Sequence, residues 1–316
     1  MTSVMPLQTH EHALDVLRPA MQFMERGEQV ALAIVTGTEG GGVRAPGAMM
    51  AVSESGHSAG YVSGGCIDAD VRLNAQEALQ DGVMRQIRYG AGSPFADIHL
   101  PCGGAIDLII LPIRSHAELM SLATPLEARR PATLSVSGNG ALGAPSGSAL
   151  FQTVFVPKIA LRIAGRGADC LALARIADAA GMEVHLQLPD EGDYAAACAT
   201  EFARVDRLQT PSHLPEPDDD AWTAFVLMFH DSHWEVPLLR QAVAGPAFYI
   251  GAVGSRKTQL RRQEALRAEG LCETSIRRIR GPIGLVPSMR DASMLAISTL
   301  SEIIGCFQSA REAERV

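Results

Sequence analysis

Two cysteines of this chain each lie beside a pair of glycines. The residues are Gly64, Gly65 and Cys66 in one run, and Cys102, Gly103 and Gly104 in the other. Because glycine has no side chain to cover a neighbouring thiol, both thiols should be reachable, and backbone N–H groups would favour their thiolate forms. Such thiols could ligate a soft metal, carry sulfur or hold a thiol-rich cofactor. Small residues packed at tight turns explain the pair equally well, and no CxxC spacing indicates a structural zinc site.

An arginine follows a third glycine-rich segment of the same half of the chain. Arg44 and Gly47 enclose Ala45 and Pro46, directly after a run of glycines. The guanidinium group of Arg44 can donate paired hydrogen bonds to a phosphate, and its charge would favour a nearby thiolate. We therefore expect Arg44 and Gly47 to belong to the same candidate site as the thiols.

The second half contains an incomplete dinucleotide-binding fingerprint between a predicted strand and a predicted helix. Gly165 and Gly167 permit a tight turn and a close approach of a diphosphate to the helix N-terminus. The third position is Cys170, which predicts looser or shifted packing of helix on strand. Asp190, after the next strand, could accept a hydrogen bond from a ribose hydroxyl. The incomplete motif favours a Rossmann-type unit without bound nicotinamide over a working NAD site.

A second strand-to-helix turn carries anion-binding residue types. Gly254 exposes backbone N–H groups, Ser255 offers a hydroxyl, and Arg256 can grip phosphate oxygens. From 255 to 280, eight basic residues face three glutamates, a net charge of +5 in a chain whose total is −8. This run predicts either an anion site or a solvated helix face. His230, at another strand end, is a further candidate for ligand contact.

These residues need elements to position them. In the first half, the apolar patterns predict two helices and several strands. The helices span 10–27 and 67–82, and the strands span 29–38, 48–53, 57–66, 84–90, 105–113 and 151–157. The pattern weakens from 115 to 157, which is rich in turn formers. We expect the domain boundary near Pro157, with an N-terminal mixed α/β domain and linker over 1–157.

In the second half, strands and helices alternate with short connections. Strands are predicted over 158–165, 182–191, 221–231 and 247–255, and helices over 171–181, 237–245, 256–270 and 292–307. This alternation predicts a mostly parallel, doubly wound sheet. The fold class is therefore α/β, with a Rossmann-like domain over 158–316, in which ligands bind beyond the carboxyl ends of the strands.

Composition excludes several classes of protein. The 316 residues are 47% hydrophobic and 20% charged, which excludes intrinsic disorder. We expect no membrane span and no secretory signal. We also expect no nucleic-acid partner, because the chain outside the basic run is acidic and would repel phosphates. Six dispersed cysteines favour free thiols and a cytoplasmic location. Of the remaining four, Cys198 and Cys306 should pack within helices, Cys272 should be exposed in a loop, and Cys170 should have a pKa lowered by its helix start.

The combination of motifs resembles the XdhC/CoxI family, the accessory proteins of molybdenum hydroxylases, along nearly the whole chain. In the first half it is carried by R-x-P-G at Arg44–Gly47, G-G-C at Gly64–Cys66 and C-G-G at Cys102–Gly104. In the second half it is carried by the segments Gly165–Cys170, His230–Asp231, Tyr249–Arg256 and Pro282–Leu285.

This resemblance implies a chaperone without catalytic residues. Family members bind the molybdenum cofactor, protect it while a cysteine desulfurase supplies its terminal sulfur, and insert it into an apo molybdenum hydroxylase of the xanthine dehydrogenase or aldehyde oxidoreductase type. The implied cofactor is molybdopterin or its cytosine dinucleotide form, and Cys66 or Cys102 could contact its metal. The implied partners are the hydroxylase large subunit, the desulfurase, cofactor biosynthesis enzymes and, as a homodimer, a second copy of the chain.

Two other functions remain open. An NAD(P)-dependent oxidoreductase would need a good fingerprint and a proton donor near the nicotinamide. Cys170, in place of the third glycine, weakens the fingerprint, and His230 is the only candidate proton donor. A pure interaction protein would bind no small ligand.

Overall fold

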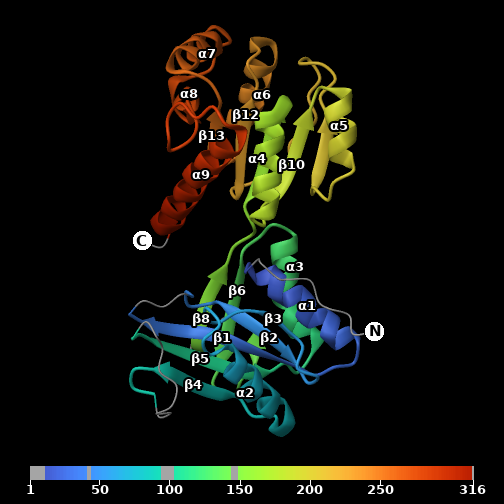
Figure 1. Ribbon diagram of the computed structural model, residues 1–316, viewed down its shortest axis with the longest axis vertical. Helices are drawn as coiled ribbons and strands as arrows, with labels where there is room; N and C mark the ends of the chain where they lie inside the picture. Colours follow the sequence, from blue (N-terminus) through green and yellow to red (C-terminus); the bar gives the residue numbers. More distant parts are fainter. Residues whose placement is uncertain (1–10, 41–43, 94–102, 144–148, 315–316) are drawn as a thin grey trace. The chain divides into compact units, whose positions relative to one another are not determined.

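The structure is a computed structural model of the 316-residue chain, and it describes residues 11–40, 44–93, 103–143 and 149–314. The chain divides into two compact units, Met1–Pro157 and Lys158–Val316 (Figure 1). No helix within the described ranges combines the length and apolar composition that crossing a membrane requires.

The first unit is built on a five-stranded sheet in which every neighbouring pair is antiparallel. The strand order is β3-β2-β1-β5-β4. The strands are β1 (Val30–Glu39), β2 (Met49–Ser53), β3 (Ser58–Gly60), β4 (Arg85–Gly90) and β5 (Ala105–Pro112). β1 and β5 form the longest pairing and carry runs of buried apolar residues on both faces, which fits strands covered on both sides.

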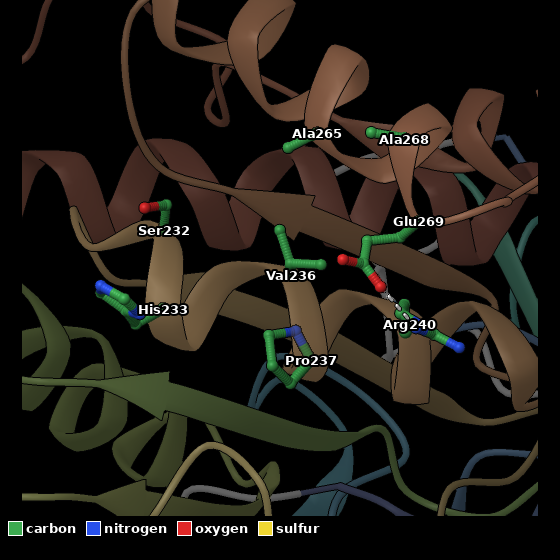
Figure 2. Close-up of a pocket in the computed structure, with 8 residues that line it drawn as sticks. All are labelled: Ser232, His233, Val236, Pro237, Arg240, Ala265, Ala268 and Glu269. Atoms are coloured by element: carbon green, nitrogen blue, oxygen red, sulfur yellow. Dashed lines mark hydrogen bonds and ion pairs between the residues drawn. The ribbon is translucent and has the colours of Figure 1, made fainter.

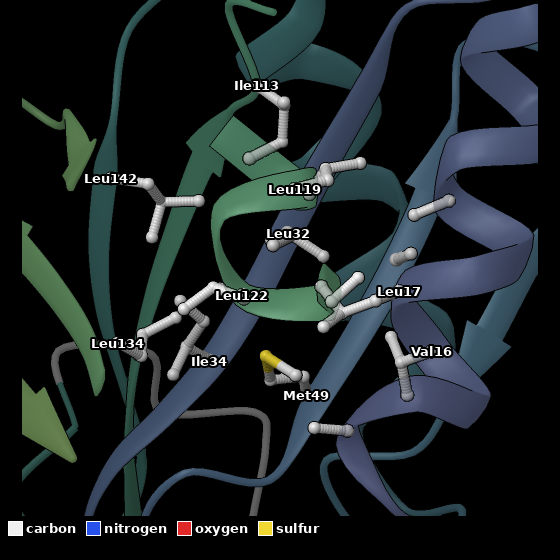
Figure 3. Close-up of a cluster of buried hydrophobic side chains, with 14 of the residues drawn as sticks. Val16, Leu17, Leu32, Ile34, Met49, Ile113, Leu119, Leu122, Leu134 and Leu142 are labelled. Carbon is white, nitrogen blue, oxygen red and sulfur yellow. The ribbon is translucent and has the colours of Figure 1, made fainter. Parts of the chain in front are cut away.

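One face of this sheet packs against two helices and a smaller sheet. The helices are α1 (Ala13–Glu25) and α3 (His116–Glu127), and the smaller sheet has the order β7-β6-β8. Its strands are β6 (Ala132–Ser137), β7 (Leu142–Gly143) and β8 (Ala149–Phe155). Figure 3 shows Leu17 of α1, Leu32 of β1 and Leu122 of α3 meeting in this core, and all three are almost completely buried.

The opposite face is covered by α2 (Asp68–Asp81). Its inward residues Val71, Ala75 and Ala78 are fully buried against the sheet. Small alanines let the helix approach the sheet closely, and the segment that carries Cys66 leads directly into this helix.

Two expectations for the first unit were wrong. The strand predicted over 57–66 ends at Gly60, because the following residues form a turn around Asp68. The weakly patterned region after 115 contains α3 and β6, which were not predicted. Pro125 within α3 and the serines of β6 disguised both elements, since proline and serine usually mark turns.

The second unit is a six-stranded parallel sheet of order β11-β10-β9-β12-β13-β14. The strands are β9 (Ala160–Gly165), β10 (Glu183–Leu188), β11 (Arg204–Arg207), β12 (Thr223–Met228), β13 (Tyr249–Ala252) and β14 (Ile279–Arg280). The order reverses between β9 and β12, which is the topological switch point of a doubly wound sheet. The predicted Rossmann-like fold is confirmed.

Helices cover both faces of this sheet. One layer consists of α4 (Gly167–Ala179), α5 (Glu191–Cys198) and α9 (Ala292–Glu314), whose apolar residues share one core. The other consists of α6 (Ser232–Ala244), α7 (Arg256–Ala268) and α8 (Glu273–Arg277), whose apolar residues share a second core. Figure 1 shows α4 and α9 in front of the strands. The sequence did not predict α8, β11 or β14, all of which are short, and for α5 it placed Cys198 in a helix without giving bounds.

Candidate functional site

Antiparallel pairing brings the glycine-rich segments of the first unit to one end of its sheet. β1 leaves this end at Glu39, and β5 enters it at Ala105, the pairing partner of Glu39. β3 leaves the same end at Gly60, which pairs with Met50 near the start of β2. The predicted segments Arg44–Gly47, Gly64–Cys66 and Gly103–Gly104 therefore follow or precede strands at the same end of the sheet, and Cys102 lies outside the described residues.

Two of these segments touch through their backbones. A Cβ atom built on Gly40, which follows β1, would lie 3.2 Å from the Cα atom of Gly104, which precedes β5. Gly40 also has a φ of 71°, so any larger residue would be strained twice. Gly104, just before β5, thus lies beside Gly40, just after β1.

The Gly64–Cys66 turn is organised by the buried carboxylate of Asp68. One carboxylate oxygen accepts the N–H groups of Val62 at 2.9 Å and Ser63 at 3.3 Å. The other accepts the N–H of Gly65 at 2.9 Å and the hydroxyl of Ser63. The backbone N–H groups of Val62, Ser63 and Gly65 are therefore already hydrogen-bonded within the turn and are not free to bind a ligand.

The consequence is an exposed thiol on a rigid support. The side chain of Cys66 is a free thiol and is exposed, while Ile67 and Asp68 beside it are buried. The expectation of a reachable thiol is confirmed for Cys66. The sequence did not single out Asp68, although an aspartate two residues after the cysteine, at the start of a helix, was a usable signal.

Arg44 and Gly47 have different roles. Arg44 forms an ion pair with the exposed Glu11, so an incoming anion would compete with a carboxylate. Gly47 has a φ of 97°, and a Cβ atom there would lie 3.3 Å from Cγ2 of Thr153 in β8. Gly47 is thus required by the turn and by packing.

The fingerprint of the second unit is shaped by packing and not by ligand approach. A Cβ atom on Gly165 would lie 2.5 Å from Cβ of Met228 and 3.1 Å from Sγ of Cys170. The thiol of Cys170 therefore fills the contact between helix and strand that a third glycine usually serves. Burial, followed by the nearby Asp193 and Asp169, raises the pKa of Cys170 to about 12. The expectation of a lowered pKa was wrong, because burial outweighs the helix dipole.

Carboxylates surround the position that a dinucleotide diphosphate would take. Asp193 accepts the backbone N–H of Gly167 at 3.4 Å, and Asp169 lies in the first turn of α4. Asp190 lies 3.9 Å from the exposed Arg166, a long ion pair. Three carboxylates against one arginine disfavour a diphosphate at this helix N-terminus, and with it the NAD(P)-dependent alternative.

A cavity of about 860 Å³ lies beyond the carboxyl ends of β12 and β13. It brings together four predicted site residues, His230, Gly254, Ser255 and Arg256, whereas Gly165 and Gly167 do not line it. The sequence missed two other parts of its wall, namely Asp169 of α4 and the segment 282–289, which follows β14. The motif at Pro282–Leu285 was a usable signal for that segment.

The basic run from 255 to 280 separates into two groups. Arg262 is buried and donates to Glu235 at 3.0 Å, Arg267 pairs with Glu273, and Arg278 donates to backbone carbonyls of 243, 245 and 247. Arg256 and Lys257, at the start of α7, are exposed and have no ion-pair partner among the described residues. Arg261 and Arg277 are also exposed and have no ion pair among the described residues, but of these four residues only Arg256 lines the cavity beyond β12 and β13.

A second cavity of about 620 Å³ lies between α6 and α7. Figure 2 shows Val236 and Pro237 facing Ala265 and Ala268 across it. At one end, Arg240 and Glu269 point toward each other and form a 2.9 Å ion pair. Because these charges satisfy each other, this cavity offers a ligand little beyond apolar contact. No group of metal-ligating side chains occurs in the part of the chain that the structure describes.

The other cysteines are only partly as expected. Cys272 is exposed, and a hydrogen bond with Ser275 lowers its pKa. Cys306 is half-buried, and burial raises its pKa. Cys198, expected to pack within a helix, is exposed because it is the last residue of α5.

Comparison with known proteins agrees with both units. Residues 23–90 match the XdhC and CoxI family, and residues 161–303 match the XdhC Rossmann domain. The chain is 33% identical over 296 residues to the molybdenum cofactor insertion chaperone PaoD of Escherichia coli K12, covering 91% of this chain and 86% of that protein. A crystal structure described as a xanthine dehydrogenase from Bacillus halodurans has the same fold, with a TM-score of 0.75, 20% identity and coverage of 93% and 96%. The chain therefore belongs to the XdhC/CoxI family.

Proposed function

We propose that this protein is an accessory chaperone that binds the molybdenum cofactor, shields it while its terminal sulfur is supplied, and inserts it into an apo molybdenum hydroxylase. Its partners are then the large subunit of that enzyme, a cysteine desulfurase and the enzymes that make the cofactor. Membership of the XdhC/CoxI family and the likeness to PaoD support this role. No step of catalysis is assigned to the chain.

The observation that carries the proposal is the exposed Cys66 thiol on its Asp68-organised turn. A thiol is a soft donor suited to molybdenum or to a transferable sulfur, so the donor chemistry fits the cargo. Arg44 lies at the same end of the sheet and can exchange its exposed partner Glu11 for the phosphate of the pterin, because exposed ion pairs contribute little stability. Gly103 is exposed at this end, whereas Gly104 is buried beside Gly40.

The cofactor supplies the molybdenum chemistry once it has reached its client enzyme. The chain itself holds and orients it: the Cys66 turn presents the thiol, Arg44 neutralises phosphate charge, and the exposed Gly103 leaves room for a flat ring system. The rigid hydrogen bonds of the turn mean that little order must be gained on binding.

The test is to purify the full chain from a host that makes molybdopterin and to measure pterin content and activation of an apo hydroxylase. We expect bound pterin, with activation strongly reduced in Cys66→Ala and unchanged in Cys272→Ala. The second variant is a matched control because Cys272 is also an exposed free thiol. Absence of pterin from the wild-type protein would leave a pure interaction protein, and turnover of NAD with a small substrate would make it an oxidoreductase. Either result overturns the proposal.

A further inference from the structure

The cavity between His230 and Arg256 has the size and position of a small-ligand site. Its volume of about 860 Å³ lies within the range of roughly 300–1,000 Å³ that is typical of ligand pockets. It lies beyond the carboxyl ends of β12 and β13, next to the point where the strand order reverses. Doubly wound sheets bind their ligands in this region.

One end of the cavity is positive. Arg256 lines it, and Lys257 follows, so two exposed basic residues open α7. A helix N-terminus carries a partial positive charge, so basic residues placed there are electrostatically unfavourable. A bound anion removes this repulsion. The Ser255 hydroxyl also lines this end and accepts the N–H of Thr258 at 3.1 Å.

The other parts of the wall suit a nucleoside. Asp169 and His230 can exchange hydrogen bonds with ribose hydroxyls or with the edge of a base. The segment after β14 contributes an apolar side, with Ile283 buried at its base. Leu285 and Val286, adjacent in this segment, are 65% and 49% exposed and offer an apolar surface on which a base could stack.

The position at which this fold usually binds a diphosphate, the start of α4, is unfavourable for a phosphate in this chain. At the start of α4, the N–H of Gly167 already has the Asp193 carboxylate as its acceptor, and Asp169 adds a second negative charge. The start of α7 has no acidic residue in its first turn. The favourable position for a phosphate has thus moved from β9 to β13, two strand spacings or about 10 Å along the sheet.

We infer that this cavity binds a nucleoside phosphate, with the phosphate at Ser255 and Arg256, and the base against the segment 282–289. The ligand is either a free nucleotide or the nucleotide end of a dinucleotide cofactor, since both have the same chemistry. All residues that line this cavity belong to the second unit, and its existence does not depend on the proposal for Cys66.

The test is calorimetric titration of the full chain, freed of pterin, with CMP, AMP, inorganic phosphate and NAD⁺. We expect a nucleoside monophosphate to bind at one site and more tightly than phosphate or NAD⁺. Arg256→Ala should weaken binding at least tenfold without lowering the melting temperature, because the residue is exposed. Arg261→Ala, an exposed arginine on the same helix that does not line the cavity, should leave binding unchanged.

Three results would overturn the inference: no nucleotide binding at millimolar concentration, equal weakening by both arginine variants, or tighter binding of NAD⁺. The source of the ligand follows from repeating the titration with protein that carries pterin. Loss of CMP binding in the loaded protein identifies the nucleotide end of the cofactor as the occupant. Retained binding identifies a free nucleotide, and both results support the site. Pterin content and client activation of Cys66→Ala, measured separately, show whether the chaperone function itself holds.

Discussion

The backbone N–H of Gly65 donates a 2.9 Å hydrogen bond to the carboxylate of Asp68. This bond, with those from Val62 and Ser63, sets the path of the chain on both sides of Cys66. The candidate residue Cys66 and the residue that organises its turn are therefore different, and only the first is visible as a motif.

Replacing Asp68 by asparagine should destabilise the first unit by about 1.5–3 kcal/mol, the scale of hydrogen bonds to a charged group. An amide NH₂ cannot accept the N–H groups that one carboxylate oxygen now receives. Urea unfolding measures the loss, and the alkylation rate of Cys66 reports the change in the turn. Asp81→Asn, at the exposed end of the same helix, is the control and should cost clearly less, because solvent screens its ion pair with Arg85. Equal costs would show that the turn does not depend on Asp68.

Stability should fall in alkaline solution because of Cys170. Its pKa is raised from 9.0 to about 12 by burial, so the folded thiol keeps its proton at pH values where the unfolded thiol has lost it. The contribution is complete below pH 9 and is lost between about pH 9 and 12, at up to about 1.4 kcal/mol per pH unit. Urea titrations of wild type and Cys170→Ala between pH 8 and 11 measure it. Parallel curves for the two proteins would contradict the prediction.

Two neighbouring aspartates should differ sharply in their contribution to stability. Asp219 is buried and receives two hydrogen bonds from the buried Arg162, at 2.7 and 2.6 Å. Asp218 is exposed and pairs with the partly exposed Arg204. Asp219→Ala leaves a buried charge without its counterion and should cost about 3–5 kcal/mol, whereas Asp218→Ala should cost about 0–1 kcal/mol. Thermal and urea unfolding of the two variants measure these free energies. Similar losses of stability for Asp219→Ala and Asp218→Ala would refute this account.

Gly165→Ala should destabilise the second unit by about 1–3 kcal/mol, the range for overpacking. The added methyl group would lie 2.5 Å from Cβ of Met228 on the adjacent strand. Gly192→Ala in α5 is the matched control, because a methyl group there meets nothing within 4 Å. We expect its melting temperature to be unchanged or slightly raised. A Gly165→Ala protein as stable as wild type would show that β9 and β12 can separate at this position.

The long, strongly patterned elements were predictable from the sequence. Strands such as β1, β5 and β12 contain apolar runs of four or more residues, and α1 has apolar residues at helical spacing. Elements such as α8, β11 and β14 could not be predicted, because a short element is stabilised by its neighbours more than by its own residues.

The sequence by itself determined the two-part α/β organisation, the parallel sheet of the second half and the residues Cys66, His230 and Arg256 as candidates. These follow from local periodicity and residue type. Only the tertiary structure decided which candidates share a site, because that depends on contacts between residues far apart in the chain. Three features reverse what the local sequence suggested. Asp193 occupies the N–H of Gly167 that was expected to meet a diphosphate, and burial raises the pKa of Cys170 that was expected to be lowered. Glu235 pairs with Arg262, which belongs to the run expected to bind an anion. In each case a distant side chain or the loss of water changes the electrostatic environment, which local spacing does not encode.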